Sequence, residues 1–506
     1  MDILFISPGN SNGIYQDLSN FYSAIEPPTW ALLLAQSCRS VGISVGILDI
    51  NAEKLSHESV LDRINNLNPR LICFVVYGQN VNSGTVNMSG AVSVSNYLKE
   101  KNVKAPICYV GSYVQALPVK TLQDEPSIDF AFTNEGVYAL RNVIKQSNLS
   151  DLENIKGIVW RKNGKITLNP PERVVPNDKM DIDLPGYAWD LLPFDKNPFD
   201  LYRAPLWHSE YDLSKRTPYV ALQTSIGCQF ACNFCMINIV NRNDNDEIGV
   251  AGNYSGMRYW SPEFIIKEFD KLYSLGVRTI KITDEMFLLN KKYYLPLCEM
   301  LRDRGYGQNL RMWAYSRIDT VRDPELLKTV RSAGIKWLAL GIESAEKRVR
   351  LEVSKGKFEE VDIKRVISQV EHAGINVMAN YIFGLPGDTF ESMNKTLEFS
   401  KELCTAGWNA YAAMALPGSQ LYKDAIKNNI PVPSSYESYS FHGYDTLPLK
   451  TDFLTAAEIL KFRDDAFKDY YSNEKFINKI KNNFGDSAVC NIKEMLKVKI
   501  KRKLYN

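Results

Sequence analysis

The sequence predicts an α/β protein with an N-terminal doubly wound, Rossmann-like domain, a partial (β/α)6 barrel of the TIM type and a small C-terminal helical appendage. β-rich runs alternate with helix-periodic runs along the first 150 residues, and the alternation resumes at Tyr219 for six further units. A length of 506 residues suits two or three domains. We expect a first domain at residues 1–150, a linker at 151–205, the barrel at 206–430 and the appendage at 431–506.

Composition excludes several classes of protein. A net charge of +2 gives no electrostatic case for nucleic acid. Nine scattered cysteines do not form a disulfide framework, which favours a reducing compartment. No apolar run reaches about 18 residues, so we expect no membrane span. The chain starts on the strand-like run Ile3–Ile6 without a signal peptide pattern, and we expect a cytoplasmic protein.

The first domain is expected to be a parallel sheet with helices on both faces. Strands are predicted at 3–6, 44–49, 71–76, 107–110 and 128–132, and helices at 30–41, 57–67 and 89–99. Such sheets bind ligands beyond the carboxyl ends of their strands. Turn residues gather at those ends, at Pro8–Gly13, Tyr77–Asn80, Gly111–Tyr113 and Asn134–Gly136.

The linker begins with a predicted hairpin, in which Asn163–Lys165 joins residues 157–160 to residues 166–168. A proline-rich stretch follows. The aromatic and basic segment 201–208 then either lines the active site or packs as a plain linker, and the sequence leaves both interpretations open.

The second half supplies the barrel strands, predicted at 219–224, 279–283, 310–315, 337–340, 376–383 and 410–415. Ser261 is expected to cap a helix at 262–275. Active-site groups of such barrels sit at the carboxyl ends of the strands. These ends read Asp284-Glu285, Ser316-Arg317, Gly341–Ser344, Gly384–Gly387 and Leu416–Gly418.

The appendage is predicted to contain helices at 455–471 and 474–484, after an irregular aromatic stretch at 437–447. The tail Lys493–Arg502 is basic and partly amphipathic. This pattern indicates a solvated helix face, with peripheral membrane contact as the weaker alternative.

Three cysteines, Cys228, Cys232 and Cys235, follow the first barrel strand with the spacing C-x3-C-x2-C, and Phe234 precedes the last of them. Three thiolates on one loop can bind three irons of a four-iron cluster and leave one iron open. Buried thiols are one alternative. A zinc site that borrows His208 is another.

This cysteine pattern resembles the signature of the radical S-adenosylmethionine (SAM) enzymes. The resemblance implies a [4Fe-4S] cluster whose open iron is chelated by SAM, with Phe234 near the adenine. It also implies that Asp284 and Glu285 accept hydrogen bonds from the ammonium of SAM, while Ser316 and Arg317 hold its carboxylate. Further expected SAM contacts are Glu343 of the Gly-Ile-Glu-Ser element, at the ribose or sulfonium side, and Gly384 and Pro386, near the adenine. Each of these residues could instead cap or stabilise the barrel.

The first domain resembles the cobalamin-binding domain of one radical SAM class, through Val110–Val114, Ala116–Pro118 and Asn134–Gly136. One departure is clear. Many cobalamin domains carry D-x-H-x-x-G, and here Asn10 stands where the histidine would be, so we expect no histidine on the cobalt. His57 lies on a predicted helix. The expected cobalamin contacts are Pro8, Asn10, Gly13, Tyr77, Gln79, Gly111, Ser112, Tyr113, Glu135 and Gly136.

The two resemblances together imply a cobalamin-dependent radical SAM enzyme. Such an enzyme cleaves SAM reductively to a 5′-deoxyadenosyl radical, and we expect methylation of an unactivated carbon of a small molecule. Oxidative ring closure or ring rearrangement is the alternative within the class, and a non-catalytic cobalamin or iron–sulfur sensor is the alternative outside it. The expected partner is an external one-electron reductant of the flavodoxin or ferredoxin type.

Overall fold

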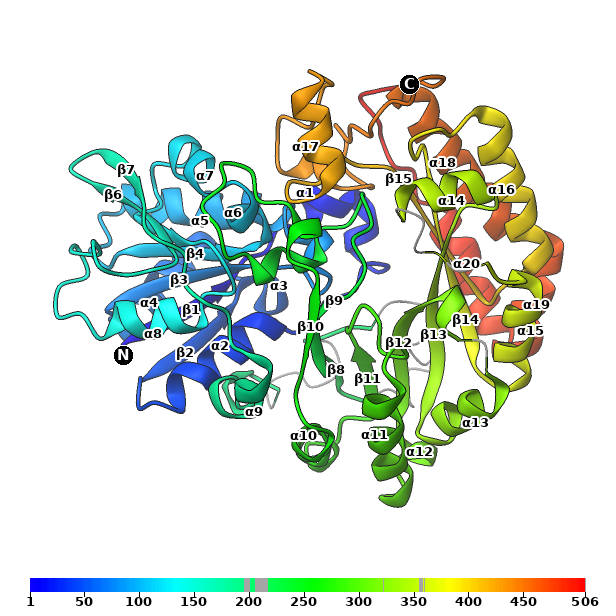
Figure 1. Cartoon of the computed structure of the whole chain (residues 1–506), viewed down its shortest axis with the longest axis horizontal. Helices are drawn as coiled ribbons and strands as arrows, with labels where there is room; N and C mark the ends of the chain where they lie inside the picture. Colours follow the sequence, from blue (N-terminus) through cyan, green and yellow to red (C-terminus); the bar gives the residue numbers. More distant parts are fainter. Residues whose placement is uncertain (195–200, 205–216, 322, 355–357, 359, 506) are drawn as a thin grey trace.

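The computed structural model describes the whole chain except residues 195–200, 205–216, 322, 355–357, 359 and 506. Figure 1 shows two α/β parts side by side, the N-terminal part in blue and cyan and the barrel in green and yellow. The segment with the strands β9 (Ser225–Cys228) and β10 (Gly256–Tyr259) lies between them (Figure 1). The predicted fold class is confirmed.

The N-terminal sheet has the strand order β2-β1-β3-β4-β5-β6-β7. Its strands are β1 (Ile3–Ser7), β2 (Val45–Asp49), β3 (Leu71–Val76), β4 (Ile107–Gly111), β5 (Phe130–Phe132), β6 (Ile158–Lys162) and β7 (Lys165–Leu168). The first five are parallel, and the hairpin β6–β7 adds antiparallel to β5. Strands β3 and β4 are buried along their whole length, as expected for a central parallel strand.

The parallel strands follow the doubly wound order 2-1-3-4-5. Successive strands are added on one side of β1 (β2) and then on the other (β3), so the strand order reverses between β1 and β3. Ligands of this fold bind at that switch point. The helices of this part are α1 (Ser11–Tyr15), α2 (Thr29–Arg39), α3 (Ile50–Glu53), α4 (His57–Leu67), α5 (Asn87–Glu100), α6 (Ser112–Ala116), α7 (Pro118–Asp124), α8 (Val137–Ile144) and α9 (Met180–Asp183). The predicted hairpin at Asn163–Lys165 is present. It belongs to the N-terminal sheet rather than standing apart from it.

The barrel is an open, curled sheet of six parallel strands in the order β8-β11-β12-β13-β14-β15. The strands are β8 (Tyr219–Leu222), β11 (Thr279–Ile282), β12 (Arg311–Arg317), β13 (Ile335–Glu343), β14 (Asn376–Phe383) and β15 (Gly407–Ala412). Its helices are α10 (Pro262–Ser274), α11 (Lys291–Asp303), α12 (Tyr306–Asn309), α13 (Pro324–Ser332), α14 (Lys347–Val353), α15 (Ile363–His372), α16 (Phe390–Leu403) and α17 (Gln420–Lys427). The predicted cap of α10 is confirmed, because the Ser261 hydroxyl accepts a hydrogen bond from the Phe264 amide.

One end of the barrel interior is closed by aromatic rings. Trp313 and Trp337 face each other across β12 and β13 and stack with ring centroids 6.1 Å apart. Phe484, at the end of α19 (Glu474–Phe484), stacks on Trp337 at 5.6 Å. Every second side chain of a strand lies on the same face, so Tyr315 and Arg317, which follow Trp313 on β12, also point into the barrel.

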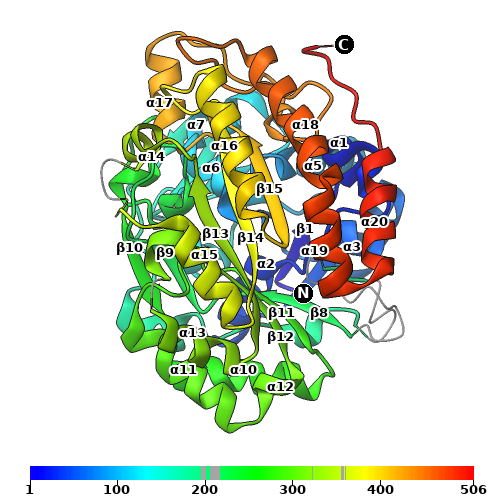
Figure 2. The ribbon, with the colours of Figure 1, turned by 90° about the vertical axis from the view of Figure 1, so that its right-hand side faces the viewer.

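The C-terminal appendage is helical, as predicted, with α18 (Ala456–Ser472), α19 and α20 (Asp486–Lys497). Helix α18 packs on β15, and Figure 2 shows α18–α20 alongside the barrel. The prediction of a solvated helical tail is wrong for its end. Helix α20 stops at Lys497, and the Arg502 side chain is buried within the protein.

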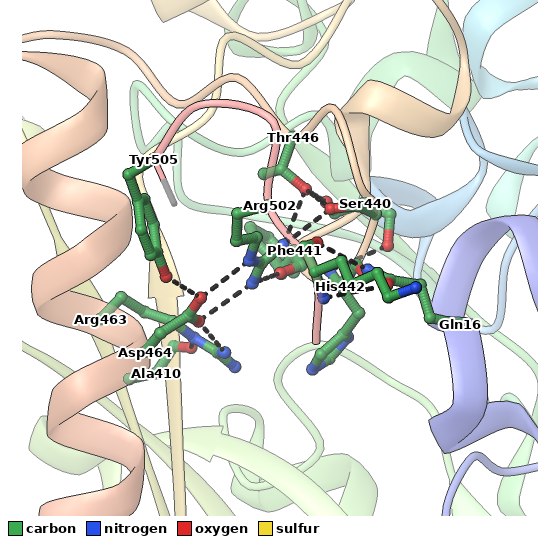
Figure 3. A network of polar contacts seen from close by, with 12 residues as sticks. Gln16, Ala410, Ser440, Phe441, His442, Thr446, Arg463, Asp464, Arg502 and Tyr505 are labelled. Carbon is green, nitrogen blue, oxygen red and sulfur yellow. Dashed lines mark hydrogen bonds and ion pairs between the residues drawn. The ribbon is translucent and has the colours of Figure 1, made fainter. Parts of the chain in front are cut away.

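Arg502 connects the loop of residues 440–446 to helix α18 (Figure 3). Its guanidinium pairs with Asp464 at 2.8 Å and donates to the carbonyls of Phe441 (2.7 Å) and Gly443 (2.8 Å). Burial alone would raise the pKa of Asp464, but the hydrogen bond from Arg502 and the charges of Arg463 and Arg502 lower it to about 2. The sequence does not distinguish Arg502 from the other basic residues of the tail, because its buried acceptors come from distant segments of the chain.

Among the described residues, no helix is both long and apolar enough to cross a membrane.

We predict that Arg502→Met destabilises the protein by about 1.5–3 kcal/mol, because it removes one of the two arginines that pair with the buried Asp464 and leaves the carbonyls of Phe441 and Gly443 without their donor. Lys499→Met is the matched control, since Lys499 is an exposed cation of the same tail. Chemical denaturation of both variants measures the effect. The pKa of Asp464 is below the unfolded value of about 3.9, so the pair stabilises fully above about pH 4. The penalty of Arg502→Met should therefore shrink as pH falls toward 2, and an unchanged penalty would contradict this account.

Candidate functional site

Cys228 ends β9, and Cys232 and Cys235 lie on the loop that follows it, between the two α/β parts. Gly227 has φ +89°, and a Cβ there would lie 2.3 Å from the Gly256 carbonyl oxygen, so only glycine fits. The Asn238 side chain then grips the Cys228 backbone. It accepts from the Cys228 amide (2.7 Å) and donates to the Cys228 carbonyl (2.8 Å). The start of the loop is thus fixed by the left-handed backbone of Gly227 and by the buried side-chain amide of Asn238.

The cysteine thiols occupy a desolvated environment. Desolvation raises the pKa of Cys228 to about 12 and of Cys232 to about 11, and it also raises the pKa of Cys235 well above its usual value. A thiol in such a place is protonated unless a metal cation replaces the proton. Among the described residues, no three His, Cys, Asp or Glu side chains converge on one point as ligands of a single ion. A four-iron cluster places each thiolate on a different iron, so three spread thiols of one loop fit it. His208, the ligand of the zinc alternative, is outside the described residues.

Aromatic rings and an arginine surround the cysteines. The Arg317 guanidinium lies 3.7 Å from the ring centroid of Phe230, a residue of the cluster loop, and is held by Asp319 at 2.6 and 2.7 Å. Phe234 packs against a small apolar group formed by Val349 and Val353 of α14 and by Ile382, Leu385 and Ala413 at the carboxyl ends of β14 and β15. The predicted carboxylate-binding arginine therefore reaches the cluster loop, and its orientation is set by a neighbouring aspartate.

Of the three predicted carboxylates, Asp284 is already fully engaged. It accepts hydrogen bonds from the Thr224 amide, the Thr224 hydroxyl and the Ser225 hydroxyl, each at 2.6 Å. These bonds tie the end of β11 to the strand that leads to the cysteines. Asp284 therefore supports the segment that precedes the cluster loop.

Glu285 and Glu343 have more capacity for a ligand. Desolvation and the nearby Asp284 raise the pKa of Glu285 to about 8, and its one hydrogen bond in the described structure is from the Asn80 side chain (2.5 Å). Desolvation raises the pKa of Glu343 to about 7, and its carboxylate has no hydrogen bond or ion pair among the described residues. Its backbone is left-handed with φ +65°, a strained state that is common at functional sites. Both carboxyl groups suit an ammonium or hydroxyl donor.

The remaining predicted SAM residues lie at the same barrel edge. The Ser316 hydroxyl contacts that of Thr320 at 2.8 Å. Gly384 directly follows β14, and its backbone amide donates to Asp388 at 3.1 Å. Pro386 is half-buried in the same turn. The structure thus brings the predicted SAM residues to one edge, as the sequence suggested.

The predicted cobalamin residues lie at the carboxyl edge of the N-terminal sheet. Gly111 ends β4 so close to β3 that a Cβ would lie 2.4 Å from the Val76 side chain. The buried hydroxyls of Ser112 and Thr85 have no hydrogen-bond partner among the described residues. Because an unmet buried hydroxyl is costly, this edge fits a polar cofactor that satisfies them.

Other predicted contacts frame this edge. Tyr77 stacks on Trp30 with ring centroids 4.7 Å apart, and Gln79 donates to the Pro27 carbonyl at 2.6 Å. Tyr113 packs edge-on against Tyr436 at 5.1 Å. These contacts hold the loop after β3 and helix α6 in place.

The loop after β1 carries Pro8, Asn10 and Gly13, of which Pro8 is buried and Gly13 is exposed. Asn10 donates to Ser89 (2.7 Å) and to Glu437 (3.2 Å), so its amide links this loop to α5 and to the C-terminal region. An amide in this position cannot replace a histidine as a cobalt ligand.

Glu135 serves as a tie between the two parts of the molecule. Both its oxygens pair with Arg258 of β10, at 3.1 and 2.7 Å, and one also accepts from the Val175 amide at 2.6 Å. Gly136 follows as the N-cap of α8. A cobalamin contact by Glu135 stays a prediction, and the structure gives its carboxylate this second use.

Several residues of the site carried no signal in the sequence. Lys281 of β11 forms an ion pair with Glu26 of the N-terminal part at 2.6 Å, and Tyr219 also donates to Glu26. His442 lies beside Tyr15, with ring centroids 5.7 Å apart, and its ring points away from the Arg502–Asp464 pair (Figure 3). Burial and two arginines lower the pKa of His442 to about 3, so this imidazole is neutral. Only the fold brings these distant segments together.

Comparison with known proteins agrees with this geometry. Residues 22–144 match the B12 binding domain, and residues 222–400 match the radical SAM superfamily. The chain belongs to the radical SAM enzymes that carry a B12-binding domain. Because the first domain type holds cobalamin and the second uses a [4Fe-4S] cluster with SAM, these three are the cofactors of the enzyme.

The enzyme resembles known proteins over almost its full length. It is 26% identical to an uncharacterized methyltransferase of Pyrococcus horikoshii, over 95% of this chain and 94% of that one. It is 22% identical to the anaerobic magnesium-protoporphyrin IX monomethyl ester cyclase of Cereibacter sphaeroides, over 93% of this chain and 70% of that one. Its fold matches the methyltransferase TsrM of Kitasatospora setae, solved with cobalamin and a [4Fe-4S] cluster, with a TM-score of 0.64 and 15% identity over 93% of this chain and 89% of that one.

We predict that Arg317→Met weakens SAM binding by about 30-fold or more, because a charged group that loses a buried partner costs at least about 2 kcal/mol. Glu285→Gln should weaken binding less, since an amide oxygen still accepts a hydrogen bond. Arg317→Lys should restore part of the affinity, because an ammonium lacks the planar fork. Isothermal titration of SAM into reconstituted protein with a measured iron content gives the answer. Unchanged affinity in both Arg317→Met and Glu285→Gln would show that these residues serve the barrel alone.

Proposed function

We propose that this enzyme is a C-methyltransferase that methylates an unactivated carbon of a small organic molecule. The observation that supports this most is the meeting of two cofactor-binding edges: Asn82, after β3 of the B12-binding domain, donates to the Cys235 sulfur at 3.5 Å. Bound there, the cofactors would supply reductive cleavage of SAM and transfer of a methyl group. Methyl transfer to carbon requires both cofactors beside one substrate, and the fold provides one shared region.

In this proposal the chain's own residues bind and orient. Cys228, Cys232 and Cys235 hold the cluster, and Asn238 and Asp284 fix the loop and strand around them. Arg317, set by Asp319, faces the carboxylate of SAM.

The remaining SAM contacts complete this arrangement. Glu285 and Glu343 accept hydrogen bonds from the ammonium and ribose sides, and Phe234 packs by the adenine together with the turn at Gly384 and Pro386. This arrangement assigns SAM to Glu285 and Glu343, which can accept further hydrogen bonds. Asp284, whose oxygens already accept three hydrogen bonds, supports the site instead.

The substrate is proposed to lie against the inner face of the barrel. The groups there are Tyr315 of β12, Asn380 of β14, and Asn409 and Tyr411 of β15, above the stacked Trp313 and Trp337. The N-terminal part contributes Tyr15 and Glu26, and the C-terminal loop contributes His442. Aromatic rings with amide and hydroxyl groups suit orientation by packing and hydrogen bonds, and the enclosure by three parts of the chain excludes water.

An external one-electron donor of the flavodoxin or ferredoxin type is proposed as the partner, in the cytoplasm. The argument is chemical: the reductive step consumes an electron, and the three cofactors above do not supply a net one.

Oxidative ring closure is a second candidate, because several relatives at 22–24% identity are magnesium-protoporphyrin IX monomethyl ester cyclases. The two reactions leave different products. Incubation with SAM that carries a deuterated methyl group, followed by mass spectrometry, separates them. A product that retains deuterium in a new methyl group supports methyl transfer, and a product that has lost hydrogen without gaining carbon supports ring closure.

We predict that the anaerobically reconstituted enzyme holds about four irons per chain and releases 5′-deoxyadenosine from SAM when a reductant is present. The variant with Cys228, Cys232 and Cys235 changed to alanine should lose both, because no thiolate remains on the loop. Cys298→Ala is the control, since this buried cysteine lies on α11 outside the loop. Full iron loading in the triple variant would contradict the assignment of the cluster.

A further inference from the structure

The loop after β3 of the B12-binding domain reaches across to the radical SAM part at two points. Asn80 donates to Glu285 at the end of β11 (2.5 Å), and Asn82 contacts the cluster loop. The loop itself is held tightly. The Asn80 side-chain oxygen accepts a hydrogen bond from the backbone N–H of Asn82 at 2.8 Å. The backbone carbonyl of Asn80 accepts one from the Ser83 hydroxyl at 2.7 Å.

The orientation of the Asn82 side-chain amide is determined by its two contacts. Its oxygen accepts a hydrogen bond from the backbone amide of Met236 at 2.8 Å. The amide nitrogen therefore faces the other way, where it donates to the Cys235 sulfur at 3.5 Å. A flipped amide would place its oxygen against the sulfur and its nitrogen against a backbone N–H, and both contacts would be repulsive.

We propose that Asn82 is a positioning residue through which the B12-binding domain tunes the reduction potential of the cluster. This inference rests on the proposed function, because it requires Cys235 to ligate the cluster. Hydrogen bonds to cluster sulfurs are among the factors that set the potential of iron–sulfur centres. The reduced cluster carries one more negative charge than the oxidised cluster, so a donor at a ligand sulfur stabilises the reduced form and raises the potential.

The consequence for the enzyme is a link between its two cofactor domains. Asn82 is only five residues beyond Tyr77 and three beyond Gln79, both expected cobalamin contacts. A B12-binding domain that is docked correctly supplies the donor, and a displaced one removes it. The cluster is then easiest to reduce when the second cofactor domain is in place.

The test is a redox titration of the cluster, followed by EPR, in three forms of the full-length reconstituted protein. Asn82→Asp keeps the acceptor for Met236 and exchanges the donor for an oxygen. Asn82→Leu removes both contacts. Asn87→Leu is the matched control, because Asn87 is a half-buried amide in the same segment whose side chain donates to the Tyr77 carbonyl and not to a cysteine.

We expect the midpoint potential to shift to more negative values in Asn82→Leu, and at least as far in Asn82→Asp, with the iron content retained. Asn87→Leu should keep the wild-type potential. As a second readout, 5′-deoxyadenosine formation by the Asn82 variants should fall with a flavodoxin as the donor and recover with a stronger chemical reductant.

Two other results are distinguishable. A wild-type potential in both Asn82 variants, with full iron loading, would overturn the inference and leave the proposed function intact, since Asn82 would then only help to dock the domains. A wild-type protein that holds no cluster after reconstitution would overturn the proposed function itself.

Discussion

The buried ion pair between Glu135 and Arg258 is the interaction on which the arrangement of the site depends. Glu135 follows β5 at the carboxyl edge of the N-terminal sheet, and Arg258 lies on β10, which pairs with the strand leading to Cys228. The two side chains are 1% and 9% exposed, and the pair is bidentate. Arg258 also donates to the Val175 carbonyl and to Asn241, so both terminal nitrogens of its guanidinium have acceptors, while its Nε has no hydrogen-bond partner among the described residues. Such a buried, bidentate pair fixes geometry more than it adds stability.

This tie explains why two independent folds form one site. Each sheet binds ligands at its own carboxyl edge, and neither edge alone would bring a methyl donor and a radical source together. The ion pair, the Lys281–Glu26 pair and the Asn80–Glu285 hydrogen bond connect the two edges at three points. The C-terminal loop with His442, held by Arg502, adds a further contact, because the Gln16 side chain of the N-terminal part donates to the His442 carbonyl at 2.6 Å (Figure 3). Glu285 and Glu343 have raised pKa values in this enclosed region, so their carboxyl groups suit a cationic or hydroxylic ligand.

The sequence was sufficient for much of the fold and for the place of the site. Strand periodicity located the barrel strands within a few residues, and the carboxyl-end rule brought Glu285, Arg317 and Glu343 to one edge, because both depend on local pattern. The tasks of individual side chains depend on contacts between distant segments. Asp284 and Glu135 looked equally available as ligands, but hydrogen bonds from Thr224 and an ion pair with Arg258 occupy them. Arg502 was predicted to be solvated, because its partner Asp464 lies far from it in the sequence.

The central claim is that cobalamin and the cluster occupy facing edges of one site in this enzyme. EPR of the fully loaded protein, with the cobalamin as cob(II)alamin and the cluster reduced, tests it most directly, because two unpaired spins interact only when they are close. The account predicts mutual broadening or splitting of the two signals, which disappears when either cofactor is omitted. Two unperturbed signals that simply add would contradict it.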